Sequence, residues 1–214
     1  MQTSHFEKQE KTLNVLDRFE THEHDVVVIG AGGAGLRAAI EASAQGAKVA
    51  LVCKSLLGKA HTVMAEGGIA AALANVDKDD NWQTHFTDTM FGGKYVNNNK
   101  MAEIHAKEAP ERVHELEHWG AVFDRTLQDK GVHMGIDVYM ECTISKLLKD
   151  GDRISGAFGY WRETGKFVVF KAKSIILATG GVCKIFKINS NSWEYTADGQ
   201  ALAYNAGAEI IDSE

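Results

Sequence analysis

The sequence predicts an α/β fold with a parallel sheet, and three consecutive segments carry that prediction. Residues 25–30 (DVVVIG) are an unbroken β-branched run, which is typical of a strand buried on both faces. A glycine-rich turn and a helix-favouring stretch, residues 33–44, follow, and residues 48–54 (KVALVCK) repeat the strand pattern. Strand, turn, helix and strand within about 30 residues form a βαβ unit, whose right-handed crossover makes its two strands parallel.

The helix of this unit has an apolar side and a defined end. Leu36, Ala39 and Ile40 are spaced along one side of a helix, so we expect them to face the core. The pair Gln45-Gly46 follows, and glycine often ends helices because it adopts the left-handed conformation without strain.

The middle of the chain is expected to be helical. Residues 55–74 show neither a period of 2 nor one of 3.6, so we expect a loop that runs into a short helix. Residues 80–93 and 99–120 have helical patterns. Pro110 lies within the second of these and is expected at the first turn of a helix, where its missing N–H costs nothing.

The second half of the chain is expected to form strands. Residues 132–150 are strand-like, and residues 154–181 predict a hairpin that turns at 163–166. A separate buried strand is expected at residues 175–178. One alanine-rich helix, at about residues 198–206, should end at Gly207.

The composition describes an ordinary globular chain. Of its 214 residues, 44% are hydrophobic and 24% charged, which is enough for a buried core. Its 23 basic and 29 acidic residues give a formal charge of −6, so nucleic acid is not expected as a partner. Residues 1–24 form a polar leader without the features of a signal or transit peptide, and no apolar run approaches a transmembrane segment.

The cysteines favour a reducing environment. Cys53, Cys142 and Cys183 are odd in number and far apart in the sequence. This arrangement predicts neither a disulfide framework nor a metal or iron–sulfur site, and it indicates the cytoplasm.

The turn after the first strand has the pattern Gly30-x-Gly32-x-x-Gly35, which favours dinucleotide binding because it follows a strand and opens a helix. Gly30 permits the tight turn, Gly32 lets the backbone approach a pyrophosphate, and Gly35 lets the helix pack closely. The N-terminus of the helix then offers N–H groups and a positive dipole end to the phosphates. The sequence therefore predicts a Rossmann-like FAD/NAD(P)-binding domain, with a glycine turn that binds no ligand as the alternative.

The pattern alone does not choose between FAD and NAD. An acidic residue that holds a ribose is expected at the end of the second strand, but Cys53, Lys54 and Ser55 stand there. This departure disfavours a dehydrogenase that uses free NAD.

A competing enzyme class comes from residues 114–118 (HELEH), which match the HExxH zinc pattern. On a helix, Leu116 lies nearly opposite His114 and His118, so the two histidines are expected to face solvent. A zinc site needs a third ligand, for which Glu141 is the conceivable residue. We therefore predict a solvated helix face and no metal.

Three other positions have both a plain and a functional interpretation. Residues 178–181 (ATGG) end a predicted strand, where ligands gather in open α/β sheets, although a simple strand-to-loop turn has the same pattern. Asp198 either caps the last helix or contacts a ligand. His61, in a loop of small residues, is by itself more typical of a structural or exposed histidine.

Taken together, five segments resemble the N-terminal flavin-binding part of the flavoprotein subunit of succinate dehydrogenase and fumarate reductase. They are GAGGAGLRAAIEA, KAHTVMAEGGIAAAL, EAPERVHELEHWGAVFDR, SIILATGG and NSNSWEYTADGQALAYNAGAEIID, in this order, and the match covers residues 25–212. The resemblance implies a partial FAD-binding domain over residues 25–214, joined to a β-hairpin or meander, with the family's capping domain absent. In this family the histidine of HTVMAEGG carries FAD covalently on the 8α carbon, and His61 occupies that position.

The resemblance also implies a set of cofactor contacts. The glycine turn would hold the diphosphate, residues 53–68 would wrap the adenosine and flavin, and Thr179, Gly180 and Asp198 would add further contacts. The implied cofactor-binding residues are Gly30, Ala31, Gly32, Gly33, Ala34, Gly35, Cys53, Lys54, Ser55, His61, Thr62, Ala65, Glu66, Gly67, Gly68, Thr179, Gly180 and Asp198. The HELEH helix falls on a family segment that binds no metal.

Two departures from the family pattern limit what can be expected. A glycine-rich segment of the family is missing at Arg125-Thr126, which resembles an internal deletion, and the chain stops after residues 210–214 (IIDSE), where the family continues into the substrate-capping domain. The family's substrate-binding histidines and arginines lie in the missing parts. No catalytic acid or base is therefore assigned.

The leading hypothesis is a flavoprotein of this type that supports succinate–fumarate oxidoreduction and passes electrons to an iron–sulfur subunit, then to quinone. The resemblance implies a dicarboxylate substrate, membrane-anchor partner subunits, and a cytoplasmic location or one peripheral to the cytoplasmic face of a membrane. We expect this form to lack turnover, because the groups that position substrate are missing. The alternatives are a non-catalytic FAD-binding fragment, a flavoprotein like L-aspartate oxidase, in which FAD is not covalently bound and that histidine is lacking, and, more remotely, an HExxH zinc hydrolase.

Overall fold

A six-stranded sheet forms the core of the first of two compact units into which the chain divides. The computed structural model describes residues 19–64, 68–75, 77–121, 136–189 and 195–210. The first unit combines the described residues of 1–64 and 134–214, and the second comprises those of 65–133.

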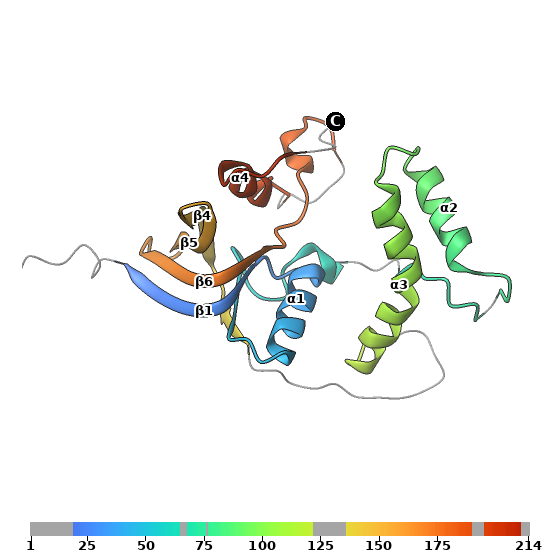
Figure 1. Ribbon diagram of the computed structural model, residues 1–214, viewed down its shortest axis with the longest axis horizontal. Coiled ribbons are helices and arrows are strands. Elements are labelled where there is room, and N and C mark those ends of the chain that lie inside the picture. Colours follow the sequence, from blue (N-terminus) through green and yellow to red (C-terminus); the bar gives the residue numbers. More distant parts are fainter. Residues whose placement is uncertain (1–18, 65–67, 76, 122–135, 190–194, 211–214) are drawn as a thin grey trace, which may run out of the picture. The chain divides into compact units, whose positions relative to one another are not determined.

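The sheet has parallel and antiparallel halves (Figure 1). Its strands β1, β2, β3 and β6 pair in parallel, whereas β5 and β4 continue the sheet beyond β6 as an antiparallel pair. The α/β class and the parallel sheet with its added hairpin are confirmed. In spatial order the strands are β3 (Asp137–Tyr139), β2 (Val49–Val52), β1 (Glu20–Ile29), β6 (Phe167–Leu177), β5 (Arg153–Trp161) and β4 (Cys142–Asp150).

The predicted βαβ unit is present. Helix α1 (Gly33–Ala44) connects β1 to β2, and Val26 of β1 lies beside Val49 of β2. Ala39 of α1 is fully buried in the cluster between the helix and the sheet, but Leu36 is 36% exposed. The expected apolar side of the helix is thus only partly right, because small side chains make the contact at which helix and sheet approach most closely.

A second core lies in the same unit and involves helix α4 (Asp198–Asn205). Leu202 of α4 packs with buried residues of β1, β4 and β6, among them Val27 and Phe170, which are both fully buried. Helix α4 ends before Gly207, whose φ of 104° is left-handed, as the sequence predicts.

Strand β6 corrects one expectation. The sequence predicted the second strand of a hairpin and then a separate strand at residues 175–178, whereas β6 runs without interruption from Phe167 to Leu177. Its residues in the larger core are Val168, Phe170 and Ala172, followed by Ile175 and Leu177. The alternation of core-facing and outward-facing residues thus shifts by one position after Ala172. Because of this shift, the sequence pattern of one continuous strand resembles that of two separate strands.

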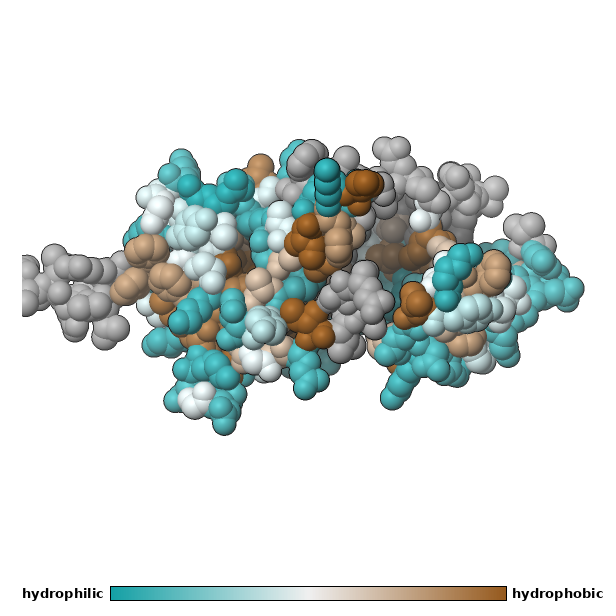
Figure 2. Space-filling model, turned by 90° about the horizontal axis from the view of Figure 1, so that it is seen from above, coloured by the Kyte–Doolittle hydropathy of each residue, from teal (hydrophilic) through white to brown (hydrophobic). Residues whose placement is uncertain are grey.

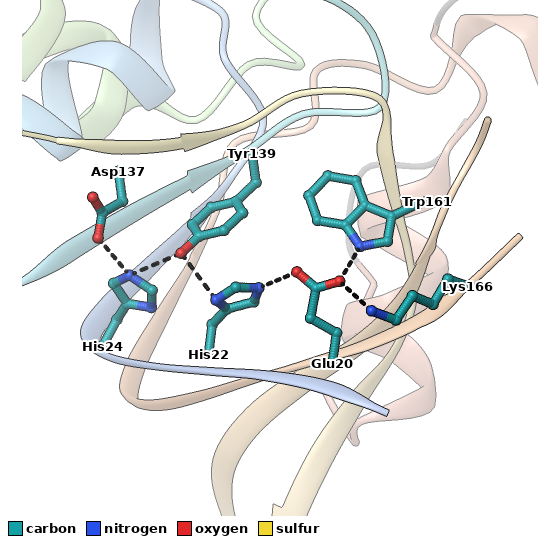
Figure 3. Close-up of polar contacts among 7 residues, drawn as sticks. All are labelled: Glu20, His22, His24, Asp137, Tyr139, Trp161 and Lys166. Atoms are coloured by element: carbon teal, nitrogen blue, oxygen red, sulfur yellow. Dashed lines mark hydrogen bonds and ion pairs between the residues drawn. The ribbon is translucent and has the colours of Figure 1, made fainter. Parts of the chain in front are cut away.

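Strand β1 begins at Glu20, five residues before the predicted strand and inside the segment assigned to the polar leader. Several of its polar side chains have partners on β3 and β5, which are not adjacent to β1 in the sheet (Figure 3). His24, whose side chain is 1% exposed, lies 3.1 Å from Asp137, and the Tyr139 hydroxyl lies 3.3 Å from Nδ1 of His22. We call these residues, together with Glu20, Trp161 and Lys166, the amino-end cluster.

The second unit contains two helices, α2 (Trp82–Gly92) and α3 (Asn99–His118). Each begins after an asparagine whose side chain accepts a backbone N–H: Asn81 from Thr84, and Asn98 from Met101. Pro110 was expected at the first turn of a helix. Instead, α3 continues through it, and the buried residues on either side, Ala106 and Val113, hold the helix together by packing.

The surface is mixed in character. Hydrophobic side chains lie in several separate groups among hydrophilic ones on the face shown in Figure 2. Among the helices of the described ranges, none is both long enough and apolar enough to cross a membrane.

Candidate functional site

A cavity of about 270 Å³ opens in the first unit where parallel strands end. Its wall combines the ends of β1, β2 and β6 with the start of β4, the short 3-10 helix η2 (His61–Met64) and the first turns of α4. Small-molecule sites range from about 300 to 1,000 Å³, so this cavity is close to the lower limit of that range.

The cavity brings together most of the predicted site residues. Gly35 is not among the wall residues, and Ala65, Glu66 and Gly67 lie outside the described residues. Gly68 belongs to the second unit, so its place relative to the cavity is not described. The predicted residues in the wall are Gly30, Ala31, Gly32, Gly33, Ala34, Cys53, Lys54, Ser55, His61, Thr62, Thr179, Gly180 and Asp198.

The glycine turn is required by close backbone approaches. Gly30 has a left-handed φ of 114°, and a Cβ there would lie 2.1 Å from the carbonyl oxygen of Ala178. A Cβ on Gly35 would lie 1.8 Å from the carbonyl oxygen of Gly30. Neither position therefore accepts a larger residue without moving backbone, and the turn and α1 are held close to the end of β6.

Gly32 has a different role. A Cβ there would make only ordinary contacts, 3.5 Å from Oγ1 of Thr62 and 3.7 Å from Cβ of Ala60. The packing of the protein does not require a glycine at this position, so its missing side chain leaves space in the cavity. As the N-cap of α1, Gly32 also offers no side-chain oxygen to the first-turn N–H groups, and the first turn carries no acidic residue. These features fit an anion.

Thr62 ties η2 to this turn. Its Oγ1 accepts a 3.0 Å hydrogen bond from the backbone N–H of Gly33. The bond places the neighbouring His61 in the same wall of the cavity as the glycine turn. The His61 ring stacks on the ring of Tyr195, with centroids 5.3 Å apart and an interplanar angle of 18°.

Lys54 and Asp198 form an ion pair in the wall. Nζ of Lys54 donates to Oδ2 of Asp198 and to Oγ1 of Thr196, each at 3.0 Å. Burial would raise the pKa of Asp198, but the hydrogen bonds from Lys54 and Thr196 outweigh it and hold that pKa below its usual value. Asp198 was also considered as a helix cap. The N-cap is instead Ala197, at a left-handed φ of 65°, and Asp198 is the first helical residue.

Two cysteines that are distant in the sequence meet in the wall. The N–H of Cys142 donates to the carbonyl oxygen of Cys53 at 3.0 Å, and both cysteines are free and buried. Burial raises the pKa of the Cys142 thiol to about 12 and also raises that of Cys53. At neutral pH both are therefore unreactive thiols that contribute apolar surface to the cavity.

Sequence reasoning missed several wall residues. Cys142, Thr143 and Ile144 come from the start of β4, and nothing in the local sequence indicates that this strand lies near β2. Tyr195 and Leu202 lie in a segment that had been singled out only for Asp198. The aromatic residue three positions before that aspartate could have drawn attention to Tyr195.

The HELEH segment lies on α3, and its histidines face solvent as predicted. The His114 side chain is 59% exposed, and His118 is exposed as well. Within the described part of the chain, no group of three or more histidine, cysteine, aspartate or glutamate side chains has the geometry to hold a metal ion.

A glycine turn between a buried strand and a helix, at the carboxyl edge of a parallel sheet, defines a dinucleotide-binding α/β domain. The family described as "FAD binding domain" matches residues 25–134 and 125–214. The chain belongs to this family.

Individual relatives name the branch that it resembles. One subunit of the fumarate reductase (CoM/CoB) of Methanothermobacter marburgensis is 36% identical over 91% of this chain. The succinate dehydrogenase flavoprotein subunit of Coxiella burnetii is 33% identical over 90% of it. The solved Sdh1 complex of Mycobacterium smegmatis superimposes on 88% of this chain with a TM-score of 0.79 and 49% identity. The predicted relationship to the flavoprotein subunits of these oxidoreductases is confirmed.

The matches cover a limited part of the relatives. The chain spans 42% of the Methanothermobacter subunit, 40% of the Coxiella subunit, and 39% of the mycobacterial chain. It therefore corresponds to about two fifths of the length of these proteins.

Proposed function

We propose that this chain binds FAD in the cavity at the strand ends and anchors it covalently through His61. The observation that carries the proposal is the placement of His61 in the same cavity wall as the glycine turn, fixed there by the Thr62–Gly33 hydrogen bond. A histidine that is exposed to solvent, or that only fills space in the core, has no reason to lie in the cavity wall beside the glycine turn.

The residues present fit FAD. The glycine turn from Gly30 to Gly35 would hold the diphosphate, with Gly32 leaving room for it and the first turn of α1 directed toward it. Residues 53–55 and Asp198 would contact the adenosine part, and Thr179 and Gly180 would lie beside the cofactor. For residues 65–68, the flavin contacts that the resemblance implies stay a prediction.

When bound, FAD supplies a two-electron acceptor for a hydride. The chain's own contribution is the imidazole of His61. One ring nitrogen of His61 would give up its proton and bond to the 8α carbon of FAD in place of a methyl hydrogen, and the two electrons released in this oxidation would pass to dioxygen, which would become hydrogen peroxide.

For the flavoprotein of this type as a whole, we propose succinate–fumarate oxidoreduction. The names of the Coxiella and Methanothermobacter relatives support this activity, and the words "subunit" and "complex" in the names of relatives support assembly with partner chains. We propose that those partners are membrane-anchor subunits and an iron–sulfur subunit, which would hold the flavoprotein at the cytoplasmic face and pass electrons to quinone.

We further propose that the chain lacks an internal segment of its relatives near Arg125-Thr126. The family matches this chain in two segments that meet at residues 125–134. The alignment with the Methanothermobacter subunit extends over 228 positions, although 91% of 214 residues is only about 195, so at least about 33 positions are gaps in this chain. We expect binding and anchoring of FAD, without succinate turnover, from these 214 residues.

The test is denaturing gel electrophoresis with ultraviolet detection of flavin. We expect a fluorescent band for the wild-type chain, produced with FAD and any assembly factor of the host, and none for His61→Ala. His114→Ala, which removes an exposed histidine on α3, is the matched control and should keep the band. A wild-type chain that binds FAD but shows no band would favour the non-covalent alternative related to L-aspartate oxidase. Turnover of succinate with a dye acceptor would contradict the expected lack of activity.

A further inference from the structure

The imidazole of His61 lies against an aromatic side chain that the proposed function has not used. The rings of His61 and Tyr195 are nearly parallel, at 18°, with centroids 5.3 Å apart. Both residues line the cavity. The pair is formed across a long stretch of sequence, and neither residue belongs to a strand of the sheet or to helices α1–α4.

Tyr195 is itself held in place by backbone on another side. Gly180 has a left-handed φ of 83°, and a Cβ there would lie 3.0 Å from Cε1 and 3.2 Å from Cδ1 of the tyrosine ring. A Cβ on Gly181 would lie 3.7 Å from Cδ2 of the same ring. The carbonyl oxygen of Tyr195 accepts a 3.0 Å hydrogen bond from the N–H of Lys184, in the 3-10 helix η3 (Cys183–Ile185). The missing side chain of Gly180 therefore leaves space that the ring occupies, whereas a Cβ on Gly181 would make only an ordinary contact.

His61, in contrast, has few constraints of its own. It is the first residue of a four-residue 3-10 helix, and small residues surround it in the sequence. The bond that fixes η2 belongs to the neighbouring Thr62. Among the described residues, the ring contact of His61 is the stack on Tyr195, and this contact bears directly on the orientation of the imidazole plane.

We propose that Tyr195 is a positioning residue for His61, which fixes the plane of the imidazole so that a ring nitrogen is presented to the flavin for covalent attachment. This inference rests on the proposed function, because it concerns the same histidine and the same bond. Stacked aromatic pairs shift conformational equilibria by about threefold to tenfold. Loss of the ring should therefore slow attachment by about that factor, while the glycine turn still binds FAD.

The experiment compares Tyr195→Leu, which removes the aromatic ring, with Tyr195→Phe, which keeps it. Tyr204→Leu is the matched control, because Tyr204 on α4 is 62% exposed. Covalent flavin per chain is measured by fluorescence in denaturing gels at fixed times after FAD is added. Non-covalent binding is measured separately, as the rise in melting midpoint with FAD, in the same variants combined with His61→Ala.

We expect Tyr195→Leu to gain covalent flavin about threefold to tenfold more slowly than the wild type, and Tyr195→Phe and Tyr204→Leu to match the wild type. In the His61→Ala background, all of them should still show a rise in melting midpoint with FAD, which separates slower attachment from a loss of binding. The proposal is overturned if Tyr195→Leu attaches flavin at the wild-type rate, if Tyr195→Phe is as slow as Tyr195→Leu, or if Tyr195→Leu loses non-covalent binding as well. A wild-type chain without covalent flavin overturns the proposed anchor and, with it, the role of Tyr195.

Discussion

The two ends of strand β1 are built on different principles. At its carboxyl end, apolar side chains lead into a glycine turn, where backbone atoms of β1, α1 and β6 come so close that Gly30 and Gly35 have no room for a side chain. At its amino end, polar side chains such as Glu20 and His24 form hydrogen bonds with side chains of other strands. The structure of the carboxyl end is therefore determined by residues close together in the sequence, whereas that of the amino end depends on residues far away in the sequence.

The number of positions between interacting residues differs greatly at the two ends of β1. The residues that define the glycine turn lie within six positions of one another. In the amino-end cluster, His24 and Asp137 are 113 positions apart, and Glu20 and Trp161 are 141 apart. Four substitutions test whether the two ends are as independent as this comparison suggests.

The largest effect is expected at the carboxyl end, from Gly35→Ala. The new Cβ would lie 1.8 Å from the Gly30 carbonyl oxygen, so α1 must move away from the strand, at a cost of about 3 kcal/mol of unfolding free energy. The rise in melting midpoint on adding FAD should also be lost. Urea unfolding with and without FAD measures both effects.

The control for that substitution is Gly92→Ala, in α2. A Cβ there meets nothing within 4 Å, so this helical change should be neutral or stabilise α2 by up to about 1 kcal/mol. Equal losses of stability in the two variants would mean that the close approach at Gly35 has no special cost.

An intermediate effect is expected at the amino end, from His24→Ala. The buried imidazole leaves a cavity and loses its contacts with Asp137 and the Tyr139 hydroxyl, which should lower the free energy of unfolding by about 2 kcal/mol. Binding of FAD should not change, because the cavity wall contains no residue of the amino-end cluster. His114→Ala on the exposed face of α3 should stay within about 0.5 kcal/mol of the wild type. A loss of FAD affinity in His24→Ala would show that the two ends are coupled.

The smallest effect is expected on the loss of stability at acidic pH. Asp198 in the cavity and Glu20 in the amino-end cluster both have lowered pKa values, because hydrogen bonds outweigh the burial that would raise them. A carboxyl group whose pKa is lower in the folded state stabilises the fold above its unfolded-state pKa, near 4, and that stability is lost as pH falls through the folded-state pKa. Asp198→Asn and Glu20→Gln should therefore each flatten the decline in stability below about pH 5. At pH 7 each should cost less than about 1 kcal/mol, since these groups are partly exposed. A decline as steep as that of the wild type would contradict this assignment.

How far the fold could be predicted from the sequence follows the same division. The βαβ unit, its glycine turn and the last helix were predicted because each is coded by a short continuous segment, and α1 spans the predicted residues 33–44. The start of β1 was missed because its polar residues do not resemble a buried strand until their partners are known. Pro110 was misplaced because tertiary packing keeps α3 continuous through it.

The candidate site could be predicted only in part. The residues of the glycine turn other than Gly35, and those at the end of β2, line the cavity; that they contact a cofactor stays a prediction of the motif and the resemblance. Cys142 could not be identified and Tyr195 was overlooked, because their presence in the wall depends on how β4 and the segment before α4 return to the sheet. Local sequence carries no information about such a return.

The pairing of β1 with β6 has a consequence for biosynthesis. Val26 pairs with Ser174, and the cavity wall extends to Leu202, so both the sheet and the cavity need residues from near the start and near the end of the chain. Because a ribosome releases the chain from its N-terminus, β1 is made long before its central partner exists. In the nascent chain, the edge of β1 that later pairs with β6 therefore stays open until residues 167–177 have emerged, and the cavity can form only once Leu202 has emerged.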